Sequence, residues 1–95
     1  MTERTPCRTP AGKSATNIPT WKFDACRAAL LAELTGGPVP AKDIAARAGE
    51  RLSAPDRDAL GALGWHMTTV RLEMEVRREL ERIPGQTPVT LRRPR

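Results

Sequence analysis

Residues 64–93 read GWHMTTVRLEMEVRRELERIPGQTPVTLRR, and the spacing of apolar side chains changes within this stretch. In its first half, apolar residues recur every three or four positions, as they do on one face of a helix. They form two neighbouring stripes, one of Trp65, Thr69, Leu72 and Val76 and one of Met67, Val70 and Met74. So wide an apolar face predicts a helix central to the fold, beginning near Trp65 and holding Trp65 in the core.

The remaining face of this helix is predicted to point to solvent. It carries His66, Thr68, Arg71, Glu73, Glu75 and Arg78. Glu75 lies four residues from Arg71, and Glu73 lies four residues from Arg77. Such pairs contribute only about 0.2–0.5 kcal/mol each.

The second half of the stretch predicts a β-hairpin. Residues 80–83 and 89–92 are short strand-like pieces on either side of Pro84-Gly85-Gln86-Thr87-Pro88. Proline followed by glycine suits the two central positions of a type II turn, because proline fixes φ and glycine accepts a positive φ. An isolated hairpin is barely stable, so this one must pack against the helices.

A first helix is predicted to begin near Trp21, with Thr20 as its N-cap, and to end at Gly36-Gly37. Its apolar positions are Phe23, Cys26, Leu30 and Leu34. The following Pro38-Val39-Pro40 is too rich in proline for a central strand, so it forms either a short edge strand or an extended linker.

Two short helices are predicted between this linker and the central helix. The first begins near Ala41, ends by Leu52 and has a narrow apolar face of small residues, to which a neighbouring helix can pack closely. This face consists of Ala41, Ile44, Ala45 and Ala48. The second runs from Pro55 to Leu63, with Ser53 as its N-cap and Gly64 dividing it from the central helix.

Residues 1–19 are predicted to form a disordered basic tail. Polar residues and proline dominate this segment, and Ile18 is its one large aliphatic residue after Met1. The tail therefore cannot bury enough apolar surface to offset the entropy of ordering it. Residues 20–95 are then one domain, which needs nearly every large apolar side chain for its core.

Composition narrows the classes of protein to consider. The 95 residues suffice for one domain, and no apolar run reaches the roughly 20 residues of a membrane helix. The first 20 residues lack the apolar stretch of a secretory signal. Two cysteines cannot build a disulfide framework or a four-ligand zinc site. We therefore expect a cytoplasmic binding protein that uses no metal or cofactor, binds no small-molecule substrate and does not contact a membrane.

Catalytic residues are not expected either. Cys26 lies on an apolar stripe, Cys7 lies in the predicted tail, and the single histidine, His66, has no evident carboxylate partner. Ala11-Gly12-Lys13-Ser14 has the end of a phosphate-binding P-loop but lacks the first glycine and the preceding strand. We predict that the protein is not an enzyme.

The charge of the chain is basic, with 16 Lys and Arg against 11 Asp and Glu, a net charge of +5. Residues 65–95 hold seven arginines and four glutamates, a net +3. This imbalance is compatible with a polyanionic partner and equally with simple solubility.

The order of helix, short extended piece, two further helices and hairpin resembles the winged helix-turn-helix domain. The resemblance is sharpest at Thr68-Thr69-Val70-Arg71 and at Leu80-Glu81-Arg82-Ile83-Pro84-Gly85. These segments are similar to the recognition helix and wing of bacterial regulators of the GntR, MarR and PadR kind. Residues 64–73 are also similar to a group of small uncharacterised bacterial proteins with this predicted fold.

The resemblance covers about residues 23–93 and implies a mainly α fold with a small β-hairpin (α+β). Three or four helices would be followed by a C-terminal two-stranded wing. The chain departs from these regulators at Arg78-Glu79, where they usually have a glycine before the first wing strand.

The implied function is that of a DNA-binding protein, in particular a small transcriptional regulator that reads duplex DNA. In helix-turn-helix proteins the second helix of the motif enters the major groove. The residues that it would use here are His66, Thr68, Thr69 and Arg71. The wing would present Arg82, Gln86, Thr87, Arg92 and Arg93 to the backbone or the minor groove. Lys42, at the start of a helix, would pair with a phosphate.

One alternative stays open. Small winged helices also serve as protein-interaction modules that do not bind DNA, because a fold does not determine a function. The chain would then bind a protein partner or form a homodimer. Four glutamates dilute the positive field around the proposed DNA surface, at positions 73, 75, 79 and 81.

Overall fold

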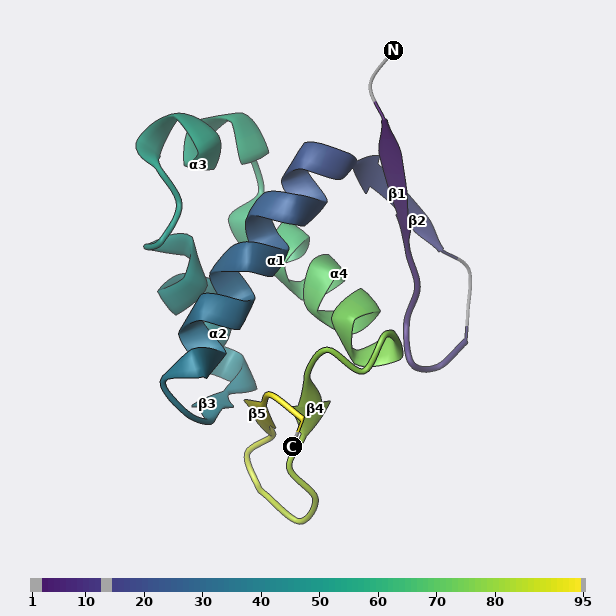
Figure 1. The fold of residues 1–95 in the computed structure, drawn as a ribbon, viewed down its shortest axis with the longest axis vertical. Coiled ribbons are helices and arrows are strands. Elements are labelled where there is room, and N and C mark those ends of the chain that lie inside the picture. Colours follow the sequence, from purple (N-terminus) through teal and green to yellow (C-terminus); the bar gives the residue numbers. More distant parts are fainter. Residues whose placement is uncertain (1–2, 13–14, 95) are drawn as a thin grey trace.

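Four helices and two small antiparallel sheets make up the computed structural model, which describes residues 3–12 and 15–94 (Figure 1). The helices are α1 (Thr20–Thr35), α2 (Ala41–Gly49), α3 (Ala54–Leu60) and α4 (Leu63–Val76). The strands are β1 (Arg4–Cys7), β2 (Thr16–Pro19), β3 (Val39–Pro40), β4 (Glu81–Arg82) and β5 (Thr90–Arg92). The expected mainly α fold with a small β component (α+β) is therefore confirmed.

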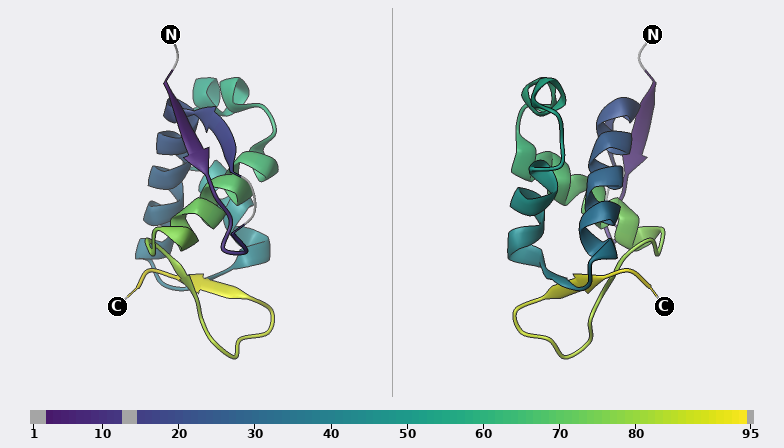
Figure 2. Two further views of the ribbon diagram at one scale, coloured as in Figure 1. Left: turned by 90° about the vertical axis from the view of Figure 1, so that its right-hand side faces the viewer. Right: turned by 60° about the vertical axis from the view of Figure 1, so that its left-hand side comes forward.

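α1 lies at the centre and packs against both α2 and α4, which also pack against each other (Figures 1 and 2). Its inward face is the predicted one of Phe23, Cys26, Leu30 and Leu34, all of them buried. Burial raises the pKa of the Cys26 thiol to about 11, which suits an inert core residue. The prediction that Thr20 caps the helix is wrong, because Pro19 holds the cap position and the Thr20 hydroxyl lies 2.7 Å from that of Thr5.

The two short helices are present as the sequence predicts, but α3 ends at Leu60 and not at Leu63, which is the first residue of α4. α2 turns Ile44 and Ala48 into the core, and α3 is capped by Ser53, whose Oγ accepts a hydrogen bond from the Asp56 N–H at 3.2 Å. The end of α2 approaches the start of α4 closely: a Cβ at Gly49 would lie 2.6 Å from a methyl carbon of Leu63. Gly64 does not divide the helices, because α4 already begins at Leu63.

α4 faces the core with only one of its two apolar stripes. Met67, Val70 and Met74 are buried, whereas Trp65 is 50% exposed. The prediction that Trp65 lies in the core is therefore wrong. Helix geometry explains the outcome, because a helix that turns Val70 and Met74 inward turns the stripe through Trp65 and Leu72 away from the core.

Glu73 lies on the buried side of α4, not on the solvent face predicted for it. Its carboxylate accepts three hydrogen bonds from Arg8, from the backbone N–H at 2.7 Å, from Nε at 3.0 Å and from Nη2 at 2.8 Å. A fourth comes from Arg77 Nε at 2.7 Å, which confirms the expected pair of Glu73 and Arg77. These donors replace water around the buried charge. The hydrogen bonds from Arg8 lower the pKa of Glu73 to about 2.

The N-terminal segment is the largest correction to the sequence analysis. β1 and β2 pair as an antiparallel hairpin, with Thr5 opposite Ile18 and Cys7 opposite Thr16, where a disordered tail was predicted. Cys7 and Ile18 are each only 2% exposed and belong to the core shared with the helices. The hairpin is therefore part of the domain and not a tail outside residues 20–95. Residues 1–2 and 13–14 of the predicted tail lie outside the described residues.

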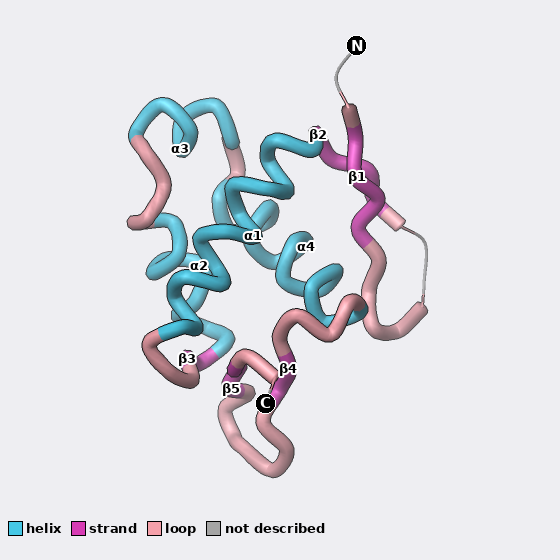
Figure 3. The backbone as a smooth tube through the Cα atoms, viewed as in Figure 1, coloured by secondary structure: helices cyan, strands magenta, loops and turns pink. Residues whose placement is uncertain are grey.

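The C-terminal sheet confirms the predicted hairpin and extends it by one strand. β4 and β5 pair on either side of a turn at Pro84-Gly85, where Gly85 has φ 77°. β3 is the edge strand that the sequence left as one of two options, and it pairs with β5 to give the strand order β3-β5-β4. Figure 3 shows this sheet at one end of the helices and the β1–β2 hairpin along their side.

The connection from α4 to β4 is short because the chain reverses at Arg78. This residue has φ 61°, the left-handed conformation that glycine usually supplies after a helix. The Glu79 N–H then donates a hydrogen bond to the Met74 carbonyl at 2.9 Å, which closes the end of α4. Among the described residues, no helix is long and apolar enough to cross a membrane.

Candidate nucleic-acid interface

The residues predicted to read bases lie on the first turns of α4 and differ in accessibility. Thr68 is exposed, whereas His66 and Thr69 are half-buried. The Nδ1 atom of His66 lies 2.8 Å from the Ala62 carbonyl oxygen, and its ring meets the indole of Trp65 edge to face at 4.8 Å. His66 is thus held against its own helix, which leaves Thr68 as the accessible polar side chain of this group.

Arg71 is less accessible than a base-reading arginine requires. Its side chain is only 14% exposed, and Nη1 donates a hydrogen bond to Glu75 at 3.2 Å, as expected from the sequence. Burial lowers the pKa of this guanidinium. The other oxygen of Glu75 accepts a hydrogen bond from Arg82 Nε at 2.7 Å. Arg71 therefore holds Glu75 in place between two arginines and does not project toward a ligand.

The other predicted residues gather around the C-terminal sheet. Lys42 is exposed in the first turn of α2, and this turn is tied to the hairpin because the Ala41 N–H donates to the Val89 carbonyl at 2.9 Å. Gln86 and Thr87 are exposed in the loop of the hairpin. We call this region the hairpin end and define it by Lys42, Arg82, Gln86, Thr87, Arg92 and Arg93.

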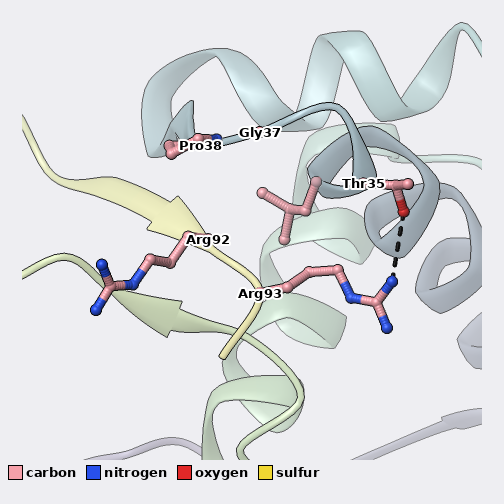
Figure 4. A pocket seen from close by; sticks show the side chains of 6 residues that line it. Thr35, Gly37, Pro38, Arg92 and Arg93 are labelled. Atoms are coloured by element: carbon pink, nitrogen blue, oxygen red, sulfur yellow. Dashed lines mark hydrogen bonds between the residues drawn. The ribbon is translucent and has the colours of Figure 1, made fainter. Parts of the chain in front are cut away.

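Arg92 and Arg93 line a cleft of about 330 Å³ between β5 and the end of α1. Figure 4 shows their guanidinium groups on opposite sides of the strand end. Arg93 reaches the Thr35 hydroxyl at 3.5 Å, and Arg92 Nε donates to Glu81 at 3.3 Å. Since the two cations diverge, they do not surround a single small anion.

The structure thus separates the ten predicted residues into two groups. α4 begins beside α3, whereas the loop of the C-terminal hairpin forms the opposite end of the molecule along its longest axis (Figures 1 and 2). Of these ten residues, the exposed cations lie in the hairpin end. The group on the first turns of α4 presents Trp65 and Thr68 to solvent and no exposed cation.

A comparison with protein families matches residues 4–91 to a family of unknown function, DUF6958. The chain belongs to this family. The DUF6958 match begins at the first residue of β1 and ends within β5, so it covers the N-terminal hairpin and all but the last residue of the C-terminal one. No curated protein and no solved structure gave a significant match.

For this DUF6958 chain, the sequence did not reveal the exposure of Trp65 on α4. Leu72 and Val76 are half-buried. They are not among the partly buried side chains that pack against the core, which within the described residues are Leu31, Ala41, Ala45, Leu52 and Leu63. The presence of two apolar stripes on one helix was the available signal. Within residues 3–12 and 15–94, no three His, Cys, Asp or Glu side chains are grouped to hold a metal ion.

Proposed function

We propose that the chain is a winged-helix protein that binds duplex DNA, with the hairpin end on the phosphate backbone. The observation that carries the proposal is the strand order β3-β5-β4, in which the strand between α1 and α2 pairs with the second strand of the hairpin. This pairing joins the helices and the hairpin into one unit, as the winged-helix resemblance requires. A DNA-binding protein of this size would act as a small transcriptional regulator.

The charges of the hairpin end support backbone contact. Among the described residues, neither Lys42 nor Arg93 forms an ion pair, so both cations are available to phosphates. Lys42 also lies in the first turn of α2, where the helix dipole favours an anion. Arg82 forms an ion pair with Glu75, and Arg92 forms one with Glu81. These two arginines therefore contribute less to phosphate binding.

The role of α4 differs from that implied by the resemblance. Arg71 is held by Glu75 and largely buried, so it is not the residue that bridges a guanine. Thr68 remains as a possible donor to a base or phosphate. With few free cations, the affinity for DNA should come from contacts with its phosphate backbone and show little sequence preference.

The test is a fluorescence anisotropy titration of random-sequence duplex DNA at two salt concentrations. About two to four phosphate contacts predict a slope of about −2 to −4 for the logarithm of affinity against that of salt. Lys42→Ala with Arg93→Ala should weaken binding to all sequences and flatten the slope by about 2. The matched control is Arg47→Ala with Arg57→Ala, which removes two exposed cations outside the hairpin end and should change binding little.

Two results would overturn the proposal. Equal losses in both double variants would mean that only total charge matters. A wild-type chain that shows no salt-dependent association at low ionic strength would not be a DNA-binding protein.

A second candidate function is favoured by the 50% exposure of Trp65, which suits a protein-interaction module. Tryptophan is enriched at the energetic centres of protein interfaces. In this alternative α4 contacts a protein and the chain does not bind DNA. The salt-dependence titration separates the two functions.

A further inference from the structure

We propose that two adjoining clefts at the C-terminal end of α4 form a binding site for a small organic anion, a molecule with a carboxylate or phosphate group on an apolar body. One cleft, of about 500 Å³, is lined by Arg78, Leu80 and Arg82. The other, of about 460 Å³, lies between Val76 and the loop after β1 (Figure 1). Pro10 of this loop lines both clefts, which we together call the loop cleft.

The loop cleft is distinct from the proposed DNA surface. Arg82 is the one residue that it shares with the hairpin end. The sequence does not reveal the site, because the loop after β1 that forms one wall was predicted to be disordered. The inference therefore goes beyond DNA binding and concerns a different ligand.

The size and lining of the loop cleft suit a small amphipathic ligand. Each part lies within the range of about 300–1,000 Å³ that is typical of small-molecule sites. Pro10, Val76 and Pro94 supply apolar wall, and arginines stand beside them. A guanidinium group binds the oxygens of a carboxylate or a phosphate through parallel N–H donors. The lining therefore matches a ligand with one apolar and one anionic part.

The charges around the loop cleft favour an anion. The side chains of Glu73 and Glu75 are 0% and 9% exposed, whereas those of Arg8 and Arg82, which pair with them, are 54% and 50% exposed. The carboxylates are thus covered, and their partner cations face solvent. The ion pairs here and the unpaired Arg78 together hold three glutamates, at positions 73, 75 and 81, and six arginines, at positions 8, 71, 77, 78, 82 and 92, a net +3.

Arg78 is the cation that the ion pairs leave free. It is exposed, and among the described residues it forms no ion pair. It is also the only described residue other than glycine with a positive φ, at 61°. Glycine adopts this conformation without the steric cost that an arginine incurs. A residue type that is unfavourable for the fold indicates that its side chain has another role, here on the wall of the loop cleft.

Thr9 is a second residue whose type the fold does not explain. Its Oγ1 atom is buried and has no hydrogen-bond partner among the described residues. Such an orphaned hydroxyl is unfavourable, and a valine of the same shape would avoid the cost. Thr9 lines the loop cleft beside Val76, and a rotation about its χ1 angle would turn the hydroxyl toward a bound anion. The preceding Arg8 fixes this wall through its three hydrogen bonds to Glu73.

The first test is an amide NMR titration of the full chain with benzoate, phenyl phosphate and the uncharged benzyl alcohol, all at one ionic strength. At least one anion should shift the signals of Thr9, Val76 and Arg78, with a dissociation constant of about 1 mM, which is within reach of so small a ligand. Benzyl alcohol should not shift them at the same concentrations. The comparison of the two anions distinguishes a carboxylate ligand from a phosphate ligand.

Two variants separate ligand binding from a structural role. Arg78→Gly should weaken anion binding at least about tenfold, because a charged hydrogen-bond donor is lost. The same variant should raise the melting temperature, because glycine relieves the left-handed backbone. Thr9→Val should weaken anion binding without lowering the melting temperature. The matched control is Arg57→Ala, which removes an exposed arginine on α3 and should leave anion binding unchanged.

The proposal would be overturned if neither anion shifted these signals up to about 20 mM, well above the expected dissociation constant. Equal shifts with inorganic phosphate would mean charge screening only and would also overturn it. So would an Arg78→Gly variant that binds the anion as the wild type does. Loss of DNA binding in Lys42→Ala with Arg93→Ala, with anion binding unchanged, would show that the two sites are separate.

Discussion

At the scale of single residues, the contacts of Glu73 make this position sensitive to mutation. It is a fully buried carboxylate that accepts four hydrogen bonds from Arg8 and Arg77. Glu73→Gln should therefore lower the free energy of unfolding by about 2–4 kcal/mol at neutral pH, because a buried pair is broken. Glu33→Gln, which breaks the more exposed pair with Arg51, should cost less than about 1 kcal/mol. Urea denaturation of both variants measures the difference.

The same carboxylate gives the fold a pH dependence. The pKa of Glu73 is lowered from 4.5 to about 2 in the folded chain, so its contribution to stability is complete above about pH 4.5. It is lost as the pH falls from about 4.5 toward 2, where the folded carboxylate takes up its proton. In urea melts, the advantage of the wild type over Glu73→Gln should shrink over this interval. An advantage that stays constant down to pH 2 would show that the ion pairs do not stabilise the fold.

The two faces of α4 should respond differently to truncation. Met74 is fully buried, so Met74→Ala should cost about 2–4 kcal/mol through lost burial and a cavity. Trp65 is half exposed, so Trp65→Ala should cost less than Met74→Ala. Thermal melts at low protein concentration compare them. A larger loss for Trp65→Ala would place this tryptophan in the core after all.

At the scale of elements, the β1–β2 hairpin contributes to the core in a way that the sequence alone does not reveal. Ile18 is 2% exposed and belongs to the core, while its neighbour Asn17 is exposed. Ile18→Ala should therefore destabilise the whole domain by about 2–4 kcal/mol, and Asn17→Ala should have almost no effect. If chemical denaturation gives the same unfolding free energy for Ile18→Ala and the wild type, the hairpin does not belong to the cooperative fold.

The elements differ in how well local sequence predicts them. α1, the Ser53 cap of α3 and the turn at Pro84-Gly85 follow from spacing and turn chemistry within a few residues. The N-terminal hairpin does not, because each of its strands contributes one buried side chain and depends on helices elsewhere in the chain for its stability. The second partner of Glu73, Arg8, is 65 residues away, so the i, i+4 pattern that reveals Arg77 does not reveal Arg8.

The orientation of α4 was the point on which the predicted site depended. Its two stripes are equally apolar, and the sequence alone does not say which one meets α1 and α2. The wrong choice placed Trp65 in the core and Glu73 in solvent. Arg71 was predicted to be a reading residue for a related reason, since its burial becomes evident only once Glu75 and Arg82 are seen beside it.

At the scale of the whole molecule, the cations of the hairpin end and the exposed Trp65 lie apart. Lys42 and Arg93 belong to the hairpin end, whereas Trp65 lies in the first turn of α4, which begins beside α3. A surface with free cations suits a phosphate backbone. We therefore place the proposed DNA contact at the hairpin end and not on the first turns of α4.

The most direct test of DNA contact at the hairpin end is an amide NMR spectrum of the full chain, followed during titration with a short duplex. We predict that DNA shifts the signals of Lys42, Gln86, Thr87, Arg92 and Arg93. If DNA instead shifts mainly Thr68, Thr69 and Arg71 and leaves the hairpin end unchanged, α4 is the DNA-reading helix and the proposed contact at the hairpin end is wrong.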